Sequence, residues 1–498
     1  MNITQNKRPP VVVIMGHIDH GKSTLLDFIR RTKVAEEEAG GITQHISAYE
    51  AKVPHEGKER IITFIDTPGH EAFRGMRGAG GLAADIAVLV VSAEDGVKPQ
   101  TKEALEWIEG HKLPFVVAFT KVDKPGVNIE SAKQTLAEAG VYVEGYGGQV
   151  PWNAVSGKTG SGVSELLETI LLVADLNNIH DENPEKTRGI IIEAHRDPKK
   201  GITATGIIKN GILTKNGFVA AQGAYAPLRI VEDFAGKPRE FVKAGSPVRI
   251  IGWSDVPQVG SEFFVFENKD EAAETSRIKT GTATQEEVQN QEEKMEKKNV
   301  PLILRADTAG GLEALVFEIK KFAHERVAPK IIAEGVGNLG ETDVKTAQSD
   351  KESILVGFHT GIDSGAKSLA ERMGVPIILD DIIYKLTENL FAKIEKRAPK
   401  ITVEKIAGAA KIVRIFSQNK DKQIVGGKVS AGVLKLGSQV NIIRRENKIG
   451  SGKIRELQYL KERINEAAEG REFGALIESK MEIAVGDTVE AFELEETQ

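Results

Sequence analysis

The sequence predicts a multidomain α/β protein. We expect, in order, an α/β domain, a β-barrel, a second α/β domain of the αβα type, a long connecting helix and a C-terminal β-barrel. Three observations predict this fold class. The 498 residues exceed the roughly 250–300 that one hydrophobic core usually supports, apolar patterns of two kinds follow one another, and one of these patterns occurs twice.

The first α/β domain is expected over residues 1–178. The apolar strands VVVIM, IITFID, IAVLVVSA and PFVVAFT alternate there with helical stretches such as TLLDFIRR and SELLETILLVADL. This alternation is typical of a mostly parallel sheet covered by helices. Residues 187–267 instead consist of short alternating strands separated by Gly, Asn and Pro, which predicts the first barrel.

The middle of the chain contains three further segments. Residues 268–299 are charged and offer almost nothing to bury, which predicts a linker, either helical or loose. Residues 300–381 restore the strand and helix alternation of an α/β domain. Residues 382–399 predict the connecting helix, and a core-facing role is favoured over a ligand role for one apolar face of it, formed by Ile383, Leu386, Leu390 and Ile394.

Residues 400–498 return to the barrel pattern and repeat it. The glycines and apolar residues of GIIKNGIL, from Gly206, match those of GKVSAGVL, from Gly427. VGSEFFVFE, from Val259, likewise matches VGDTVEAFE, from Val485. Two matches in the same order predict two copies of one barrel, with chance similarity of glycine-turn strands as the alternative.

The composition excludes several kinds of chemistry. The chain has no cysteine, so it forms no disulfide, thiol nucleophile or Cys-ligated zinc site, which suits a reducing cytoplasm. No apolar run approaches the roughly 20 residues that cross a bilayer, and the N-terminus lacks a signal-peptide pattern. We therefore expect a cytoplasmic protein without a membrane partner.

The net charge of −6 conceals a basic segment. Residues 400–463 contain 15 Lys or Arg against 5 Asp or Glu. A basic face on the last barrel would bind phosphates of a nucleic acid with an affinity that falls steeply with salt. The alternative is an ordinary solvated barrel surface.

A phosphate-binding motif follows the first strand. Its pattern G-x-x-x-x-G-K-[ST] lies between a predicted strand and a predicted helix, as the motif requires. Lys22 is expected to reach the β and γ phosphates and Ser23 to bind Mg²⁺, while glycine-freed backbone N–H groups surround the phosphates. The expected nucleotide contacts are Gly16, His17, Ile18, Asp19, His20, Gly21, Lys22, Ser23 and Thr24.

A second motif, Asp66-Thr67-Pro68-Gly69, ends another strand. Asp66 is placed to hold the hydration shell of Mg²⁺, and the Gly69 N–H to sense the γ-phosphate. Thr43 of GGIT lies in an upstream loop and could bind the same metal. We expect both loops to become ordered only around a triphosphate.

Two further strand ends predict the base pocket, namely Thr120-Lys121-Val122-Asp123 and Ser156-Gly157. The carboxylate of Asp123 suits the N1–H and amino groups of guanine, whereas adenine has a lone pair at N1. Lys121 would lay its stem over the base, and N–H groups near Ser156 and Gly157 would meet the guanine carbonyl. The ordered motifs together predict a P-loop domain that binds GTP.

His70 directly follows Gly69. An inward-pointing side chain at this position could orient the water that attacks the γ-phosphate. Because phosphoryl transfer depends on positioning and electrostatics, an unpositioned histidine would leave hydrolysis slow. The alternative is a surface histidine in a mobile loop.

The stretches GHIDHGKSTLLD, EEEAGGITQHISAYE and DTPGHEAF resemble the translational GTPases, most closely the bacterial translation initiation factor 2 family. The resemblance extends from Val11 to Glu495. It implies GTP or GDP and Mg²⁺ as cofactors, both ribosomal subunits and formylated initiator tRNA as partners, and GTP hydrolysis triggered when the large subunit joins. We expect a monomer without a DNA partner.

Carried over by resemblance, the family's nucleotide contacts fall on the positions from Gly16 to Ser23 and from Asp66 to His70, with Lys121, Asp123 and Thr43. Thr120 stands where the family has asparagine, so a hydrogen bond that braces the base pocket is either lost or rebuilt. Gly157 replaces the usual alanine.

The last barrel departs from the family at the residues that read the formyl-methionyl end. Where the family has a Lys-Arg-aromatic triplet, this sequence has Gln458-Tyr459-Leu460. Where the family has Glu-Cys-Gly, it has Glu472-Phe473-Gly474, so only Glu472 and Gly474 carry over. Phe473 could equally fill the core. Two other functions stay open, an elongation-type factor that carries aminoacylated tRNA, which the second α/β domain disfavours, and a metabolic P-loop phosphotransferase.

Overall fold

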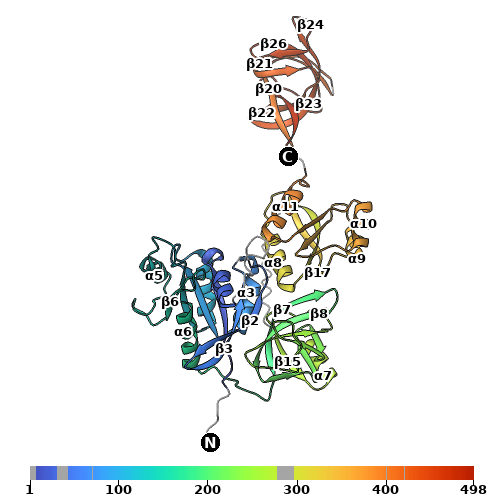
Figure 1. The fold of residues 1–498 in the computed structure, drawn as a ribbon. Coiled ribbons are helices and arrows are strands. Elements are labelled where there is room, and N and C mark those ends of the chain that lie inside the picture. The colour runs from blue at the N-terminus through green and yellow to red at the C-terminus, as the bar shows by residue number, and fades with distance from the viewer. Residues whose placement is uncertain are drawn as a thin grey trace. The chain divides into compact units, whose positions relative to one another are not determined.

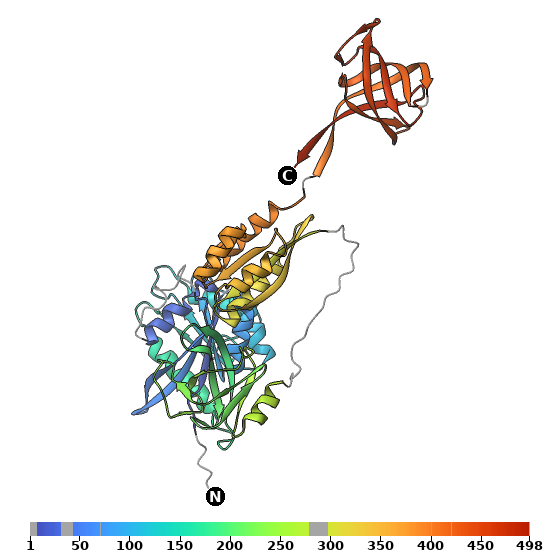
Figure 2. The same ribbon diagram turned by 90° about the vertical axis from the view of Figure 1, so that its right-hand side faces the viewer.

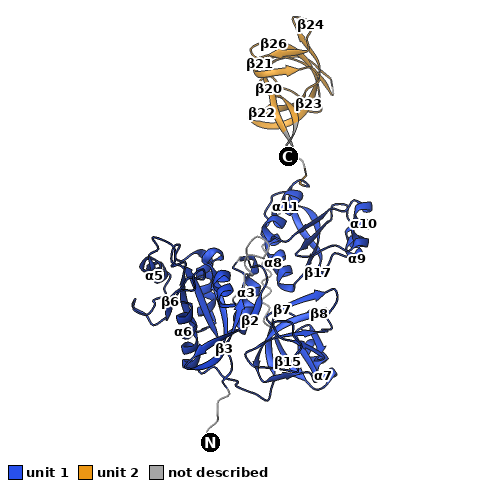
Figure 3. Cartoon of the chain, in the orientation of Figure 1, with its two compact units in different colours: residues 1–397 blue, residues 398–498 orange. Residues whose placement is uncertain are grey.

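The computed structural model describes residues 7–30, 43–69, 71–277, 297–399, 401–419 and 421–497, with the side chains of 401–403 and 495–497 left out. The chain forms two compact units, residues 1–397 and 398–498 (Figure 3). In the described ranges, no helix combines the length and apolarity that crossing a membrane requires.

The first unit begins with the predicted α/β domain. Its six-stranded sheet is parallel except at the β2–β3 pair. The order across the sheet is β2 (Ser47–His55), β3 (Lys58–Asp66), β1 (Val11–Gly16), β4 (Ile86–Ser92), β5 (Phe115–Thr120) and β6 (Trp152–Ala154).

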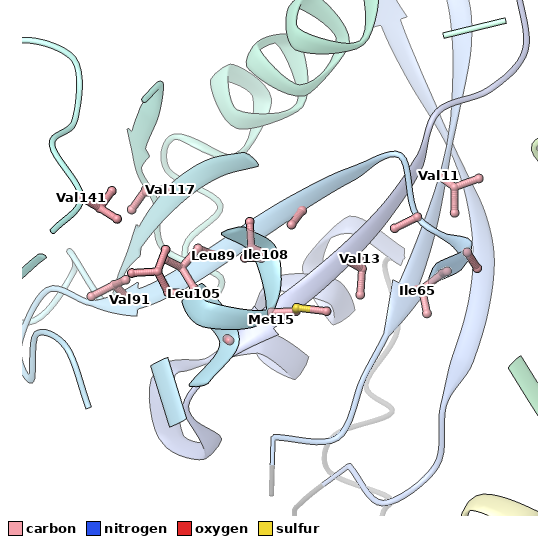
Figure 4. Close-up of a cluster of buried hydrophobic side chains, with 14 of the residues drawn as sticks. Val11, Val13, Met15, Ile65, Leu89, Val91, Leu105, Ile108, Val117 and Val141 are labelled. Atoms are coloured by element: carbon pink, nitrogen blue, oxygen red, sulfur yellow. The ribbon is translucent and has the colours of Figure 1, made fainter. Parts of the chain in front are cut away.

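Helices cover both faces of this sheet, so its central strands are apolar throughout. Val11, Val13 and Met15 pack on the side of Leu105 and Ile108 (Figure 4), whereas Val12 and Ile14 face the opposite side. The helical elements are η1 (Ile18–His20), α1 (Lys22–Arg30), η3 (Glu71–Phe73), α3 (Arg74–Ala83), α4 (Pro99–Gly110), α5 (Ile129–Glu138) and α6 (Val163–Leu176).

The first barrel follows as a seven-stranded antiparallel sheet. Its order is β11 (Ala224–Pro227), β10 (Phe218–Ala221), β15 (Glu262–Phe266), β7 (Arg188–Asp197), β8 (Gly201–Asn210), β14 (Pro247–Ile251) and β12 (Ile230–Glu232), while β9 (Ile212–Thr214) pairs with β13 (Phe241–Lys243).

Part of the predicted linker belongs to this barrel. Residues Lys269–Arg277 form α7, which packs against β10, β11 and β15 and buries Ala272 completely. The buried side chains of α7 are the small residues Ala272 and Ser276, which explains why the sequence offers little sign of packing here. Residues 278–296 lie outside the described residues, and the next strand begins at Lys298.

The second α/β domain has three layers, as predicted. Its parallel sheet has the order β17 (Val327–Val336), β16 (Lys298–Ala306), β18 (Ile354–Phe358) and β19 (Ile377–Asp380). The helices α8 (Ala309–Lys320) and α11 (Ile383–Glu395) lie on one face, and α9 (Glu341–Ala347) and α10 (Ser364–Met373) on the other (Figure 1). The expected apolar face of the connecting helix, Ile383, Leu386, Leu390 and Ile394, is fully buried.

The second unit is a closed barrel. Its order is β20 (Ile401–Asn419), β27 (Thr488–Thr497), β22 (Gln439–Arg444), β23 (Asn447–Tyr459), β26 (Glu472–Ser479) and β21 (Lys422–Lys435), and β21 pairs again with β20. The short strands β24 (Glu462–Arg463) and β25 (Glu466–Ala468) lie beside β23 and β21. The long β20–β27 pair extends out of the barrel (Figure 2).

The two barrels share one topology, which confirms the predicted repeat. The order β11-β10-β15-β7-β8-β14 corresponds strand for strand to β23-β22-β27-β20-β21-β26. The matched turn glycines also agree, since Gly211 and Gly432 have φ of 78° and 66°, a conformation that favours glycine.

Five basic side chains of the last barrel pair with carboxylates, and the basic face itself stays a prediction. Residues 464–498 contain 2 Lys or Arg against 10 Asp or Glu, and several of these acids fold back onto the basic segment. Three pairs join the two segments, Arg444–Asp487 at 2.8 Å, Arg455–Glu478 at 2.5 Å and Lys435–Glu493 at 3.2 Å. Two more lie within residues 400–463, Lys448–Glu404 at 3.1 Å and Arg463–Glu456 at 2.9 Å. A charge count over a sequence window does not show these pairings.

A buried charge cluster joins the first barrel to the first α/β domain. Asp85 accepts hydrogen bonds from the Arg8 guanidinium at 2.6 and 2.8 Å and from Lys209 Nζ at 2.6 Å. Burial raises the pKa of Asp85, but the hydrogen bonds from Arg8 and Lys209 outweigh burial and lower that pKa to about 2. Lys209 lies on β8, so the cluster fixes the barrel to the sheet.

We predict that Asp85→Asn lowers the free energy of unfolding of the first unit by about 3 kcal/mol, because it leaves two buried cations without their counter-charge. The folded-state pKa of about 2 lies below the usual value of 3.8, so this contribution is present above pH 4 and is lost as the pH falls toward 2. Denaturant unfolding at several pH values measures it.

Glu59→Gln is the matched control, because the Lys52–Glu59 pair is exposed at 67% and 61%. We expect a change within about 1 kcal/mol for this variant. Equal losses in the two variants would contradict the role of the buried cluster.

Candidate nucleotide-binding site

The phosphate-binding loop is built by glycines at the end of β1. Gly16 pairs with Val90 of β4 and has φ of 146°, and a side chain there would collide with the Val90 carbonyl. Gly21, with φ of 82°, is the residue at which η1 ends, and α1 begins at the next residue. The loop therefore turns from the sheet directly into a helix N-terminus, where backbone N–H groups can bind anions.

The ammonium group of Lys22 is buried and fixed by two backbone carbonyls. Its Nζ donates to the carbonyls of Gly16 at 2.9 Å and His17 at 2.7 Å, and the residue is only 4% exposed. An ammonium group has three N–H donors, so these carbonyls use two of them. Burial lowers the pKa of Lys22 to about 8, with Asp66 opposing the shift. Added negative charge would therefore stabilise the protonated form.

The residues predicted to bind the metal are two hydroxyls that lie together and a carboxylate near Lys22. Ser23 Oγ lies 2.7 Å from Thr43 Oγ1, so the two hydroxyls expected on one metal are already together. Asp66 is buried at 6% exposure, ends β3 next to Ile14 of β1, and lies near enough to influence Lys22. Hard oxygen ligands of this kind fit Mg²⁺.

The segment after Asp66 packs directly on the loop. Thr67 Oγ1 donates to the Ile14 carbonyl at 2.8 Å, and Arg77 Nη1 donates to the Pro68 carbonyl at 3.4 Å. A Cβ at Gly69 would lie 2.5 Å from Lys22 Nζ and 3.0 Å from the Cα of Ile18, so a side chain at this position would displace the Lys22 ammonium. His70 lies outside the described residues, and its role stays a prediction.

The two predicted base-pocket segments are joined by a hydrogen bond. Ser156 Oγ donates to Asp123 Oδ1 at 2.7 Å, and this bond lowers the pKa of Asp123, which keeps the carboxylate ionised. Lys121 has φ of 59° and pairs with Asp95 at 3.2 Å. Val122 packs against the hydrophobic core, so it anchors the loop through its side chain.

Thr120, predicted to lie in the base pocket, makes a buried hydrogen bond to the phosphate-binding loop. Its buried Oγ1 donates to the His20 carbonyl at 2.5 Å and lies 3.4 Å from the Val91 carbonyl. The hydroxyl thus connects the base-pocket strand β5 to the phosphate-binding loop.

Gly157 is required by close packing. A Cβ there would lie 2.8 Å from the backbone atoms Leu25 N and Thr24 C of α1. The loop that carries Ser156 therefore approaches α1 more closely than an alanine would allow without movement.

The two histidines of the phosphate-binding loop pack against each other. The His20 ring is buried, with Nδ1 3.4 Å from the Val90 carbonyl, and burial lowers its pKa to about 4, so the ring is neutral. His17 meets it edge to face at 5.0 Å. Asp19 lies between these two histidines, within η1, and its side chain is exposed.

Sequence reasoning missed Gln100. Its Oε1 accepts from the Ile18 N–H at 3.0 Å, which ties the phosphate-binding loop to the start of α4. Gln100 lies beyond the carboxyl end of β4, the edge of the sheet where ligands bind in such folds, and that position was the available signal.

The second unit contains a separate pocket of about 800 Å³. Gln458, Tyr459 and Leu460 line it together with Glu472 and Gly474, and Gln458 pairs with Gly474 across β23 and β26. The predicted residues of the last barrel are thus brought together. Phe473 also borders the pocket but is 5% exposed and packs in the barrel core, as the core-filling alternative expected.

Three family models match the chain in sequence order. The elongation factor Tu GTP binding domain matches residues 7–175, elongation factor G domain 2 matches residues 186–266, and translation-initiation factor 2 matches residues 274–390.

Among solved structures, the chain is similar to GDP-bound aIF5B from Aeropyrum pernix. The identity is 26%, over 98% of this chain and 92% of that chain, with a TM-score of 0.45. A bacterial selenocysteine-specific elongation factor, EF-Sec, is 24% identical over 52% of this chain and 45% of that chain, with a TM-score of 0.43.

We predict that Thr120→Val raises the Kd for a non-hydrolysable GTP analogue about tenfold. Valine keeps the shape of threonine but leaves the buried His20 carbonyl without its donor. Thr120→Ser, which keeps the hydroxyl, should stay within about threefold of the original Kd, as isothermal titration calorimetry can measure. An unchanged Kd in the valine variant would contradict the brace.

Proposed function

We propose that this chain, a translational GTPase with an initiation factor 2 domain, is a bacterial-type translation initiation factor 2 that acts in the cytoplasm. In this role it binds the ribosome and initiator tRNA, promotes subunit joining and hydrolyses GTP when docked. One observation carries the proposal: a GTP-binding domain match over residues 7–175 and an initiation factor 2 match over residues 274–390 occur in the same chain.

The nucleotide site supports GTP as the ligand. The hydrogen bond from Ser156 keeps Asp123 ionised, so that its carboxylate can accept from the N1–H and amino groups of guanine. Two carbonyls hold the Lys22 ammonium where the phosphates would bind. Ser23, Thr43 and Asp66 would hold Mg²⁺, which when bound supplies positive charge against the charge on the phosphate oxygens.

The order of segments around the γ-phosphate supports a switch. Gly69 lies against Lys22 and Ile18, so a γ-phosphate beside Lys22 would contact the segment that leads to His70. In our proposal His70 orients the attacking water once the ribosome fixes it. Phosphoryl transfer depends mainly on positioning and electrostatics. GTP hydrolysis is therefore slow as long as the ribosome has not fixed the histidine.

The pocket of the last barrel is our candidate for the aminoacyl end of the tRNA. Val413, Phe416 and Leu460 on its border are 64%, 62% and 81% exposed, an apolar surface that suits a methionyl side chain. Glu472 and Gly474 would face the same end. The family's basic triplet is absent, and basic side chains on the border of the pocket come instead from Arg414, Lys428 and Lys461.

The initiation factor 2 match favours this assignment over an elongation-type factor. Filter binding of initiator and elongator tRNA separates the two, because an elongation-type factor would retain the elongator tRNA at least as well. A metabolic phosphotransferase would instead turn over GTP rapidly without ribosomes.

We predict that ribosomes stimulate GTP hydrolysis and that His70→Ala lowers the stimulated rate at least about 100-fold with the nucleotide Kd unchanged. The histidine acts on water and makes no phosphate contact in this proposal. The measurements are single-turnover hydrolysis with ribosomes and titration with GTP without them.

His55→Ala is the matched control, since His55 ends β2 away from Ser47, the residue that pairs with Asp66. Its stimulated rate should equal that of the original protein. An unchanged rate in the His70 variant would remove the proposed role of His70, and rapid turnover without ribosomes would contradict the proposed function.

A further inference from the structure

Gln44 connects the nucleotide site to the second α/β domain. The residue is 3% exposed and follows Thr43 directly. Its Nε2 donates to the Asp381 carbonyl at 2.8 Å and lies 3.1 Å from Nε2 of His359. Its Oε1 accepts from the backbone N–H of Ile383 at 3.4 Å. One side chain from the first domain thus makes three polar contacts in another, more than 300 residues away.

These contacts occur at the N-terminus of α11. The first N–H groups of a helix have no partner within the helix, and a polar N-cap side chain usually accepts from one of them. Ile382 occupies the N-cap of α11 and has no such side chain, while Asp380 Oδ1 accepts from the Ile382 N–H at 2.9 Å. Gln44 supplies the acceptor for the next N–H, that of Ile383. It therefore acts as a cap provided by another domain.

The residues on both sides of Gln44 are also held by contacts, one set of them in the phosphate-binding site. On one side, Thr43 Oγ1 lies 2.7 Å from Ser23 Oγ in the phosphate-binding site. On the other side, His45 Nε2 lies 2.8 Å from Asp307 Oδ2, and Ile46 is buried in the core of the first domain. Consecutive Cα atoms are about 3.8 Å apart, so Thr43 cannot leave Ser23 freely while Gln44 remains bound to α11.

We propose that Gln44 is a positioning residue that uses the N-terminus of α11 to hold Thr43 opposite Ser23. The second α/β domain thereby helps to form the site for the metal and the γ-phosphate. The inference depends on the proposed function, in which Ser23 and Thr43 hold Mg²⁺ together with GTP. In the proposed switch Thr43 acts at the γ-phosphate and its metal, and GDP lacks the γ-phosphate, so loss of the Gln44 contact should weaken binding of GTP and not of GDP.

The test uses Gln44→Met, which keeps the length of the side chain and removes its hydrogen bonds, with Gln44→Ala as a second variant. We expect the Kd for a non-hydrolysable GTP analogue to rise about tenfold in the full chain with Mg²⁺ present, as for the loss of one or two buried hydrogen bonds. The Kd for GDP should stay within twofold. Gln134→Ala, on the exposed face of α5, is the matched control and should change neither Kd.

Hydrogen exchange tests the cap without any nucleotide. The peptide at the start of α11 should exchange faster in the Gln44→Met protein, because the Ile383 N–H loses its acceptor. The start of α8 is the internal reference, since there Thr308 Oγ1 accepts from the Gly311 N–H at 3.1 Å within one domain. Its exchange should not change.

Equal changes in GTP and GDP affinity, or no change in the exchange of α11, would overturn the role of Gln44 while the proposed function stands. Failure of the original protein to bind either nucleotide would instead overturn the proposed function and this inference with it.

Discussion

The buried ammonium of Lys22 is the charge on which the nucleotide site depends. A desolvated cation is costly, and here two neutral carbonyls and the carboxylate of Asp66 offset only part of that cost, since its pKa is still lowered to about 8. The surrounding structure serves to keep the lysine in this place. Gly16 lets the loop pass Val90, Gly69 leaves room for Nζ, and Thr120 ties the loop to β5. A phosphate would complete the charge balance.

The same loop also joins the parts of the first unit. Ser23 contacts Thr43, and the next two residues form hydrogen bonds with the second α/β domain. Gln44 binds the start of α11, and His45 binds Asp307. The first barrel is held by a different device, the Asp85 cluster with Arg8 and Lys209. One polar junction at the nucleotide site and another remote from it thus help to connect the first α/β domain to its two neighbours. Only the first contains residues that a nucleotide would contact.

Local patterns in the sequence were sufficient for much of this account. The alternating apolar strands, the motifs at strand ends and the repeated glycine turns each depend on residues close together in the chain, and the structure confirms the fold class and the repeat. Contacts between distant residues were not visible in the same way. The partner of Thr120, the cap from Gln44 and the carboxylates that pair with the basic segment of the last barrel are all far away in sequence. The packing of α7 buries only the small residues Ala272 and Ser276, too weak a signal for a hydrophobic pattern.

The pH dependence of GTP affinity tests the role of Lys22 most directly. A lysine with a pKa of about 8 in the empty site must take up a proton above that pH before it binds a phosphate. The Kd for a non-hydrolysable GTP analogue should therefore be constant below about pH 7 and rise toward tenfold per pH unit above pH 8. A Kd that stays constant from pH 7 to 9 would contradict the account.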